Sequence, residues 1–195
     1  MKTANNETRQ QILAKARTII AGKSYAAVGL NEILAAAAVP KGSFYHYFAS
    51  KDQFGEALLK EYFEAYLCRM DEILFEQRGS GAERLMRYWT AWAETQSSKD
   101  QEQMCLAVKL GAEVCDLSEA MREALRRGTQ KVIDRIALSI EQSEQDGSLK
   151  RVESASQMAA ILYELWVGAS LLEKIHRDGR FFEATLKRTV MLLGT

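Results

Sequence analysis

Residues 30–48 constrain the fold of this chain more strongly than any other stretch. In its first part, apolar residues recur at the i, i+3, i+4 and i+7 spacing of one helix face. These residues are Leu30, Ile33, Leu34 and Ala37. The segment that follows, residues 39–48, predicts a tight turn and a second helix of about two turns. Because so short a helix is unstable alone in water, the pattern requires a packed domain that holds it.

The second short helix combines aromatic side chains with hydrogen-bonding groups. Phe44 and Phe48 stand four residues apart, so both can pack back into the domain. The groups that can bond to phosphates and base edges are Lys41, Ser43, Tyr45, His46 and Tyr47. Two short helices joined by a tight turn are typical of a helix-turn-helix, which presents its second helix to a DNA groove. The same geometry also occurs outside DNA binding, so a pair of small core helices is the alternative.

The distribution of charge agrees with a DNA-binding N-terminal part. The whole chain has a formal net charge of zero, from 26 basic and 26 acidic residues. Residues 1–51 hold seven Lys or Arg and two Glu, a net charge of +5, so the remainder carries −5. A basic module joined to an acidic body concentrates the attraction for nucleic acid at one end of the chain.

Composition predicts an all-α protein. The 195 residues include one proline, and no run shows the strict alternation of a half-buried strand. No apolar stretch reaches the roughly 18–20 residues of a membrane span, and residues 1–8 lack the apolar core of a signal peptide. We therefore expect a cytoplasmic protein with no membrane partner. Besides the two short helices, we expect helices over residues 6–21, 51–77, 82–96, 103–114, 119–145, 153–177 and 181–193.

Residues 9–55 resemble the N-terminal domain of the TetR family of bacterial repressors. The matching features are the amphipathic first helix, Ile33, and the run 41–48 followed by Ser50 and Lys51. The resemblance implies a helix-turn-helix domain over residues 1–50 and a helical sensing and dimerisation domain over residues 51–195.

Two residues depart from the family's usual pattern. Gly29 stands where the family has Ser or Thr as the N-cap of the second helix, and Gly is an acceptable but weaker N-cap. Ala38 stands where the family has Gly in the turn. We therefore expect a positive φ at Ala38, with a strain of about 1 kcal/mol.

The resemblance also implies the partners of the chain, namely palindromic double-stranded operator DNA, a second copy of the chain and an inducer. The predicted DNA contacts are Lys41, Ser43, Tyr45, His46, Tyr47 and Lys51. Of these, Tyr45 and Lys51 are expected to hold phosphates, and Ser43 and His46 to lie nearer base edges. Family members dimerise through their last two long helices, and residues 155–175 are apolar over much of the helix circumference. Burial of that helix within one monomer is the alternative.

The three cysteines do not predict a disulfide framework. An odd number in a reducing compartment argues against structural disulfides. Cys105 and Cys115 lie about 15 Å apart along one helix, which is too far for a bond between them. Free cysteines are usually small buried hydrophobes, and we expect this of Cys68 and Cys115. His46 and His176 are distant in sequence, so we expect no metal site, and with no nucleophile–base pair or phosphate-binding loop, no cofactor and no enzymatic activity.

Cys105 is the candidate sensor residue. It lies near the start of a predicted helix, where the helix dipole favours a thiolate, and Lys109 follows one turn later. Residues 104–122 resemble a TetR branch that includes repressors responding to electrophiles and oxidants, although a Cys-Leu-x-x-x-Leu-x-x-Glu run also occurs in related repressors of non-reactive ligands. Lys174, late in the apolar helix, could stabilise the thiolate or act as a nucleophile, and a surface lysine is the alternative.

Two further hypotheses stay open. In one, an apolar or aromatic small molecule binds reversibly in a pocket of the second domain. Its candidate lining is Met70, Met86, Tyr88, Trp89, Trp92, Met104, Tyr163 and Trp166, a set that equally suits an ordinary core. In the other, the chain is a helical interaction module that does not bind DNA.

Overall fold

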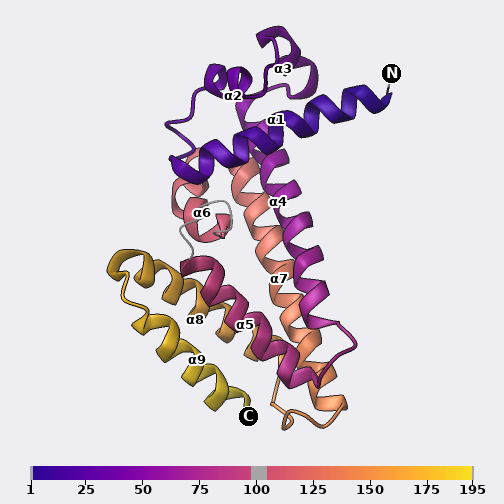
Figure 1. Cartoon of the computed structure of the whole chain (residues 1–195), viewed down its shortest axis with the longest axis vertical. Helices are drawn as coiled ribbons and strands as arrows, with labels where there is room; N and C mark the ends of the chain where they lie inside the picture. The colour runs from indigo at the N-terminus through magenta and orange to yellow at the C-terminus, as the bar shows by residue number, and fades with distance from the viewer. Residues whose placement is uncertain (1, 98–104, 195) are drawn as a thin grey trace. The chain divides into compact units, whose positions relative to one another are not determined.

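The structure is a computed structural model, and it describes residues 2–97 and 105–194 (Figure 1). All regular elements in this part of the chain are α-helices, so the all-α prediction is confirmed. The helices are α1 (Lys2–Gly22), α2 (Leu30–Ala36), α3 (Lys41–Tyr47), α4 (Lys51–Leu74), α5 (Gly81–Ser97), α6 (Leu106–Leu117), α7 (Glu119–Gln145), α8 (Ala155–His176) and α9 (Arg180–Leu193).

The helices divide into two compact units. The first unit runs from α1 through Phe63 in α4, and it also includes α6 and α7 as far as Gly128. The second unit takes the rest of α4, α5, and the chain from Thr129 onward. This division does not test the predicted functional boundary after residue 50, which stays a prediction.

The first unit is built around α1, α2 and α3 (Figure 1). The inward face of α1 is completely buried at Ile12, Leu13 and Ile20. Phe44 from α3 packs between two other buried aromatic rings, with centroid distances of 5.2 Å to Phe48 and 5.5 Å to Phe54. These contacts are what holds α3, because seven residues cannot form a stable helix alone.

The turn of the helix-turn-helix has the predicted backbone conformation. Gly29 is the N-cap of α2 and provides no side-chain hydrogen bond. Ala38 has φ of 53°, in the left-handed region, as the departure from glycine led us to expect. Pro40 is the N-cap of α3, one position before the first helical residue. Ser50 caps α4 by accepting the N–H of Gln53 at 3.1 Å.

Two glycines allow close helix approach in the first unit. A Cβ atom added at Gly55 in α4 would overlap the side chains of Tyr25 and Met121. A Cβ added at Gly128 in α7 would overlap the ring of Phe63 in α4. Glycine at these positions therefore allows α7 to pack this closely on α4.

The core of the second unit is an aromatic stack between α5, α8 and α9, which lie side by side (Figure 1). Trp89 and Trp166 are stacked at 4.9 Å with an interplanar angle of 12°, and Phe182 stacks on Trp166 at 6.0 Å. The Trp166 indole N–H donates to the Thr189 hydroxyl at 3.0 Å, which satisfies a polar group inside this core.

The start of α5 is anchored by the loop after α7. The Gly81 N–H donates to the Asp146 carboxylate at 2.7 Å, and the Ala82 N–H donates to the Ser148 hydroxyl at 2.9 Å. These two bonds satisfy N–H groups that have no partner within the helix itself.

Helix α8 keeps apolar side chains on two sides. One side packs on α5 and α9, and the other leaves Ile161, Leu171, Leu172 and Ile175 exposed. By length and composition, α8 would also pass as a membrane-spanning helix. This differs from the expectation that no apolar stretch reaches the length of a membrane span. The apolar residues of α8 are interrupted by charged ones such as Glu164 and Glu173, so no continuous run reveals them.

Candidate DNA-binding and sensor sites

Helix α3 carries five of the six predicted DNA contacts. Burial of Phe44 and Phe48 fixes one face of the helix, so its polar groups point elsewhere. Lys41 and His46 are exposed, and Tyr45 is 58% exposed although aromatic. The two remaining predicted contacts, Ser43 and Tyr47, are half-buried. The exposed set matches the chemistry that reads a DNA groove, a cation, a phenol and an imidazole on one short helix.

Lys51 lies at the start of α4 and points into the first unit. Its ammonium donates to the carbonyls of Val28 at 3.0 Å and Tyr25 at 3.4 Å, and lies 5.0 Å from the centre of the Tyr25 ring. The Tyr25 hydroxyl in turn donates to the Lys51 carbonyl at 2.7 Å. Lys51 thus ties α4 to the connection between α1 and α2, and its predicted role at a phosphate stays a prediction.

Cys105 is the N-cap of α6 and is buried, with 4% of its surface exposed. Burial raises the pKa of the Cys105 thiol, while hydrogen bonds from the Val108 N–H and the Tyr62 hydroxyl lower it by less. The Tyr62 hydroxyl also accepts the Leu106 N–H at 3.2 Å. Burial thus has the larger effect and disfavours the thiolate, and the sensor role of Cys105 stays a prediction.

The two predicted partner lysines of Cys105 lie in different units. Lys109 is in the first unit on α6, and its ammonium donates to the Ala21 carbonyl near the end of α1. Lys174 is exposed in the last turn of α8, in the second unit. The structure thus places Cys105 and Lys109 on one helix, and the roles of both lysines in sensing stay predictions.

Cys68, Cys105 and Cys115 form no disulfide bond. The expectation that Cys68 is a small buried hydrophobe is wrong, because Cys68 is exposed on α4, and Cys115 is half-buried. The reason is geometric: the apolar face of α4 at this level consists of Met70 and Leu74, and Cys68 falls outside it. Among the described residues, no group of three or more His, Cys, Asp or Glu side chains could hold a metal ion.

Residues not predicted from sequence also contact these sites. Tyr62 contacts the start of α6, as described above. Glu113 on α6 accepts the backbone N–H groups of Tyr25 at 3.1 Å and Ala26 at 2.7 Å. Glu113 is the last residue of the Cys-Leu-x-x-x-Leu-x-x-Glu run, so that pattern was the available clue to it.

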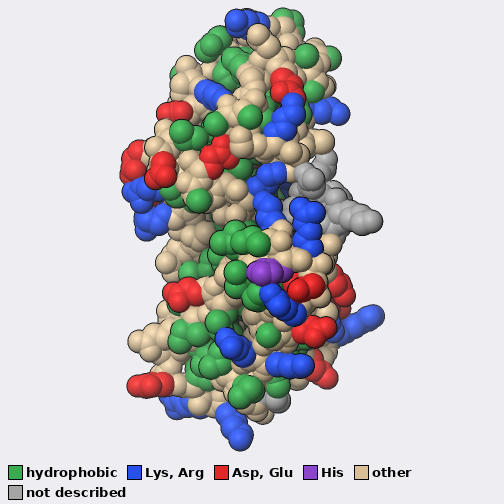
Figure 2. All heavy atoms as spheres, turned by 90° about the vertical axis from the view of Figure 1, so that its left-hand side faces the viewer, with side chains coloured by type: hydrophobic (Ala, Val, Ile, Leu, Met, Phe, Trp, Pro, Cys, Tyr) green, Lys and Arg blue, Asp and Glu red, His purple; other side chains and the backbone are tan. Residues whose placement is uncertain are grey.

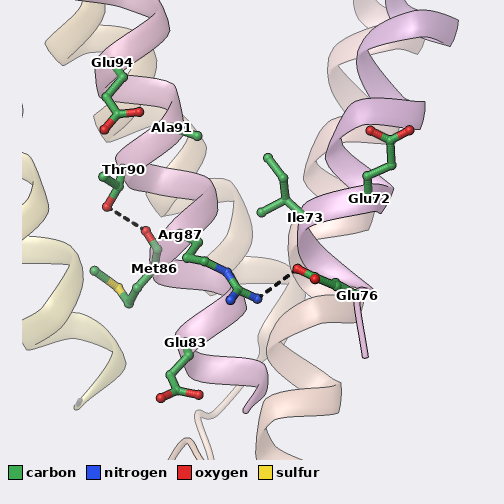
Figure 3. A pocket seen from close by; sticks show the side chains of 9 residues that line it. All are labelled: Glu72, Ile73, Glu76, Glu83, Met86, Arg87, Thr90, Ala91 and Glu94. Atoms are coloured by element: carbon green, nitrogen blue, oxygen red, sulfur yellow. Dashed lines mark hydrogen bonds and ion pairs between the residues drawn. The ribbon is translucent and has the colours of Figure 1, made fainter. Parts of the chain in front are cut away.

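A shallow groove of about 790 Å³ runs between the end of α4 and α5 (Figure 3). Its carboxylates are partly engaged: Glu76 pairs with Arg87 at 3.4 Å, and Glu83 accepts the Ser80 N–H at 2.7 Å, which lowers the pKa of Glu83. Of the predicted pocket residues, Met86 lines this groove. Met104 lies outside the described residues, and the others are buried in the core, namely Met70, Tyr88, Trp89, Trp92, Tyr163 and Trp166.

A helix-turn-helix with an exposed polar recognition helix, joined to a second helical unit, defines a DNA-binding regulator. Comparison with known families agrees. The family of bacterial regulatory proteins called tetR matches residues 12–58, and the tetracyclin repressor-like C-terminal domain matches residues 81–188. The chain therefore belongs to the TetR family of transcriptional regulators.

Individual relatives extend over nearly the whole chain. The HTH-type transcriptional repressor NemR of Escherichia coli K12 is 36% identical over 100% of this chain and 98% of its own length. The HTH-type transcriptional repressor DhaR of Mycobacterium sp. strain GP1 is 30% identical over 90% of this chain and 86% of its own length. The crystal structure of E. coli NemR in its reduced form has a TM-score of 0.88 at 38% identity, covering 94% of this chain and 95% of that one.

Proposed function

We propose that this regulator is a cytoplasmic, homodimeric repressor that leaves its operator when an electrophile or oxidant modifies Cys105. The observation that carries the proposal is the place of Cys105, a buried thiol at the start of α6 within the same compact unit as the helix-turn-helix. Similarity to NemR, a transcriptional repressor with a crystal structure described as a reduced form, supports it.

The exposed face of α8 and α9 supports the homodimer. Figure 2 shows hydrophobic side chains gathered on the part of the surface that these helices form. The exposed apolar residues there are Ile161, Leu171, Leu172, Ile175, Met191 and Leu192, and Met191 is 79% exposed. An apolar face of this kind suits a two-fold interface with a second copy. Two recognition helices related by that axis would read a palindromic operator.

The dimer can be tested through Ile175, which is 64% exposed. A charge at this position would be buried without a partner in the dimer but solvated in the monomer. We expect Ile175→Asp to sediment as a monomer at micromolar concentration and to lose at least tenfold in operator affinity. The control is Glu141→Gln, which alters an exposed charge on α7, outside these two helices. A dimeric Ile175→Asp variant would contradict this interface.

The chemical step is addition of the thiol to an electrophile. With N-ethylmaleimide, the Cys105 sulfur bonds to one carbon of the double bond, and the proton lost by the thiol is matched by one gained at the neighbouring carbon. Since Cys105 is buried, the adduct does not fit the packed site, and the start of α6 must move. Modification therefore favours a conformation other than the one that binds DNA.

A reversible small-molecule inducer is the second candidate. The observation that favours it is Trp89, whose indole N–H is buried and has no hydrogen-bond partner among the described residues. A buried donor without a partner destabilises the fold by about 1–3 kcal/mol, and an aromatic ligand with an acceptor atom would remove that penalty.

Thiol mapping with a DNA-binding assay separates the two candidates. The protein would be treated with substoichiometric N-ethylmaleimide in a Cys68→Ser background, because Cys68 is exposed and would compete for the reagent. Binding would be followed with a palindromic duplex selected from a random pool by the untreated protein. We expect labelling at Cys105 with loss of retardation, and neither in the additional Cys105→Ser variant. Labelling at Cys105 with unchanged DNA binding would direct the search to a reversible ligand.

A further inference from the structure

We infer that Glu113 is the residue that positions the helix-turn-helix from α6, with Lys109 as its partner. Glu113 holds the connection between α1 and α2, residues 23–29, and Lys109 holds the end of α1 that leads into it. This inference depends on contacts within the first unit alone. The further step, that modification of Cys105 alters DNA binding through these contacts, rests on the proposed function above.

Each charged side chain contacts backbone groups of the opposite partial charge. The two Glu113 carboxylate oxygens accept the N–H groups of consecutive residues, Tyr25 at 3.1 Å and Ala26 at 2.7 Å. The Lys109 ammonium donates to the Ala21 carbonyl, in the last turn of α1. That last turn has no basic residue of its own, so Lys109 supplies from α6 the positive charge that a helix C-terminus favours.

Lys109 and Glu113 stand four residues apart, so they share one face of α6. A cation and an anion on one face thus hold a carbonyl at the end of α1 and two N–H groups of the connection that follows it. Charge-assisted hydrogen bonds of this kind are about twice as strong as neutral ones. They also fix the position of α6 along its axis, because sliding the helix would break the Lys109 bond and the two Glu113 bonds together. We call these three hydrogen bonds the clamp.

The held connection determines where the DNA-reading helices lie. It leads directly into α2, whose N-cap Gly29 makes no side-chain hydrogen bond and so contributes little to fixing the helix. On its other side, the Lys51 ammonium bonds to the carbonyls of Tyr25 and Val28. The segment is thus fixed between α6 and the start of α4, and its release would free α2 and α3 to shift.

Cys105 is connected to this clamp by an uninterrupted helix. Glu113 is eight residues after Cys105, about 12 Å along a helix axis. The Cys105 carbonyl accepts the Lys109 N–H at 3.0 Å, so the first turn of α6 includes Cys105 itself. A bulky adduct that displaces this turn would move Lys109 and Glu113 as one rigid body. The thiol needs no direct contact with the helix-turn-helix to affect it.

The test compares Glu113→Gln with Asp116→Asn, both made in full-length protein with Cys68 replaced by Ser. Asp116 is exposed on the same helix, so the control removes one negative charge without touching the clamp. Amide hydrogen exchange would be measured by NMR at Tyr25 and Ala26. The amides of Gly81 and Ala82, which bond to Asp146 and Ser148, serve as reference in the second unit.

We expect Glu113→Gln to speed exchange at Tyr25 and Ala26 at least tenfold and to weaken binding to the selected duplex about tenfold. Asp116→Asn would change neither. A loss of DNA affinity in Glu113→Gln is informative, because removing a negative charge by itself tightens DNA binding. Unchanged exchange at both amides in a folded Glu113→Gln variant would overturn the clamp. If that variant fails to fold, as judged by circular dichroism, Glu113→Asp replaces it with the same expectations, because the shorter side chain keeps the charge but cannot reach both N–H groups.

The coupling of Cys105 to the helix-turn-helix through Glu113 is tested separately. In protein with intact Glu113, we expect the N-ethylmaleimide adduct to speed exchange at Tyr25 and Ala26 at least tenfold and to leave Gly81 and Ala82 unchanged. Loss of DNA binding with both amides still protected would overturn the route through Glu113. If the adduct leaves DNA binding intact, the proposed function fails, and the Glu113→Gln result still decides the clamp.

Discussion

In the first unit, two charged side chains of α6 hold the end of α1 and the connection to α2, whereas the core of the second unit is a stack of aromatic rings from α5, α8 and α9. Glu113 and Lys109 each contact residues about 90 positions earlier in the chain, at the end of α1 and the loop after it. In the second unit, Trp89, Trp166 and Phe182 form a continuous stack. A few directional bonds can be released by one local change, but apolar burial is lost only piece by piece. The first unit is therefore the better place for a switch.

The largest effect is expected in the second unit. Trp166→Ala removes a completely buried ring that stacks on Trp89 and Phe182, and it also leaves the Thr189 hydroxyl without the indole. We expect a loss of about 3–5 kcal/mol in the free energy of unfolding, measured by urea denaturation. Leu138→Ala, at a partly exposed site on α7, is the control and should cost much less. Similar losses in the two variants would mean that the stack is not the main support of this unit.

The next effect concerns the reactivity of Cys105. Burial raises the pKa of its thiol, so the thiolate fraction is small at neutral pH and grows with rising pH. We expect the rate of alkylation at Cys105 to increase about tenfold per pH unit between pH 6 and 8, measured by mass spectrometry of the labelled peptide. A rate that levels off below pH 7 would show that the thiolate is favoured and that burial does not control reactivity.

A smaller effect tests the close contact of α4 and α7 in the first unit. Gly128→Ala places a methyl group against the Phe63 ring, and we expect a net loss of about 1–3 kcal/mol from overpacking. Gly111→Ala in α6 is the matched control, since no atom lies within 4 Å of its added Cβ. It should gain up to about 1 kcal/mol from helix propensity alone. Thermal unfolding of both variants measures the difference, and a stabilised Gly128→Ala would contradict the close approach.

The smallest effect lies in the turn before the recognition helix. Ala38 has a positive φ, so Ala38→Gly relieves strain of about 1 kcal/mol but adds backbone entropy to the unfolded state. We expect a net gain of about 0.5 kcal/mol or less. Ala36→Gly, in the last turn of α2, should instead lose about 1 kcal/mol. Chemical denaturation of both variants measures the change in the free energy of unfolding. The two changes have opposite signs if the turn is strained, and both are equal losses if it is not.

Local features of this protein followed from the sequence alone. The paired short helices and the bounds of α7 each depend on residues within one or two turns of each other. Side-chain periodicity and capping chemistry operate at that range, so a linear pattern is enough to predict them.

The tertiary structure decided how the chemically active side chains are used. The sequence singled out Cys105, Lys109 and Lys51, but only packing showed that Cys105 is buried and that both ammonium groups bond to backbone carbonyls. The bonds of Glu113 to Tyr25 and Ala26 join residues almost 90 positions apart. Burial and hydrogen bonding at such separations depend on how helices pack in three dimensions, and no local spacing rule encodes that packing.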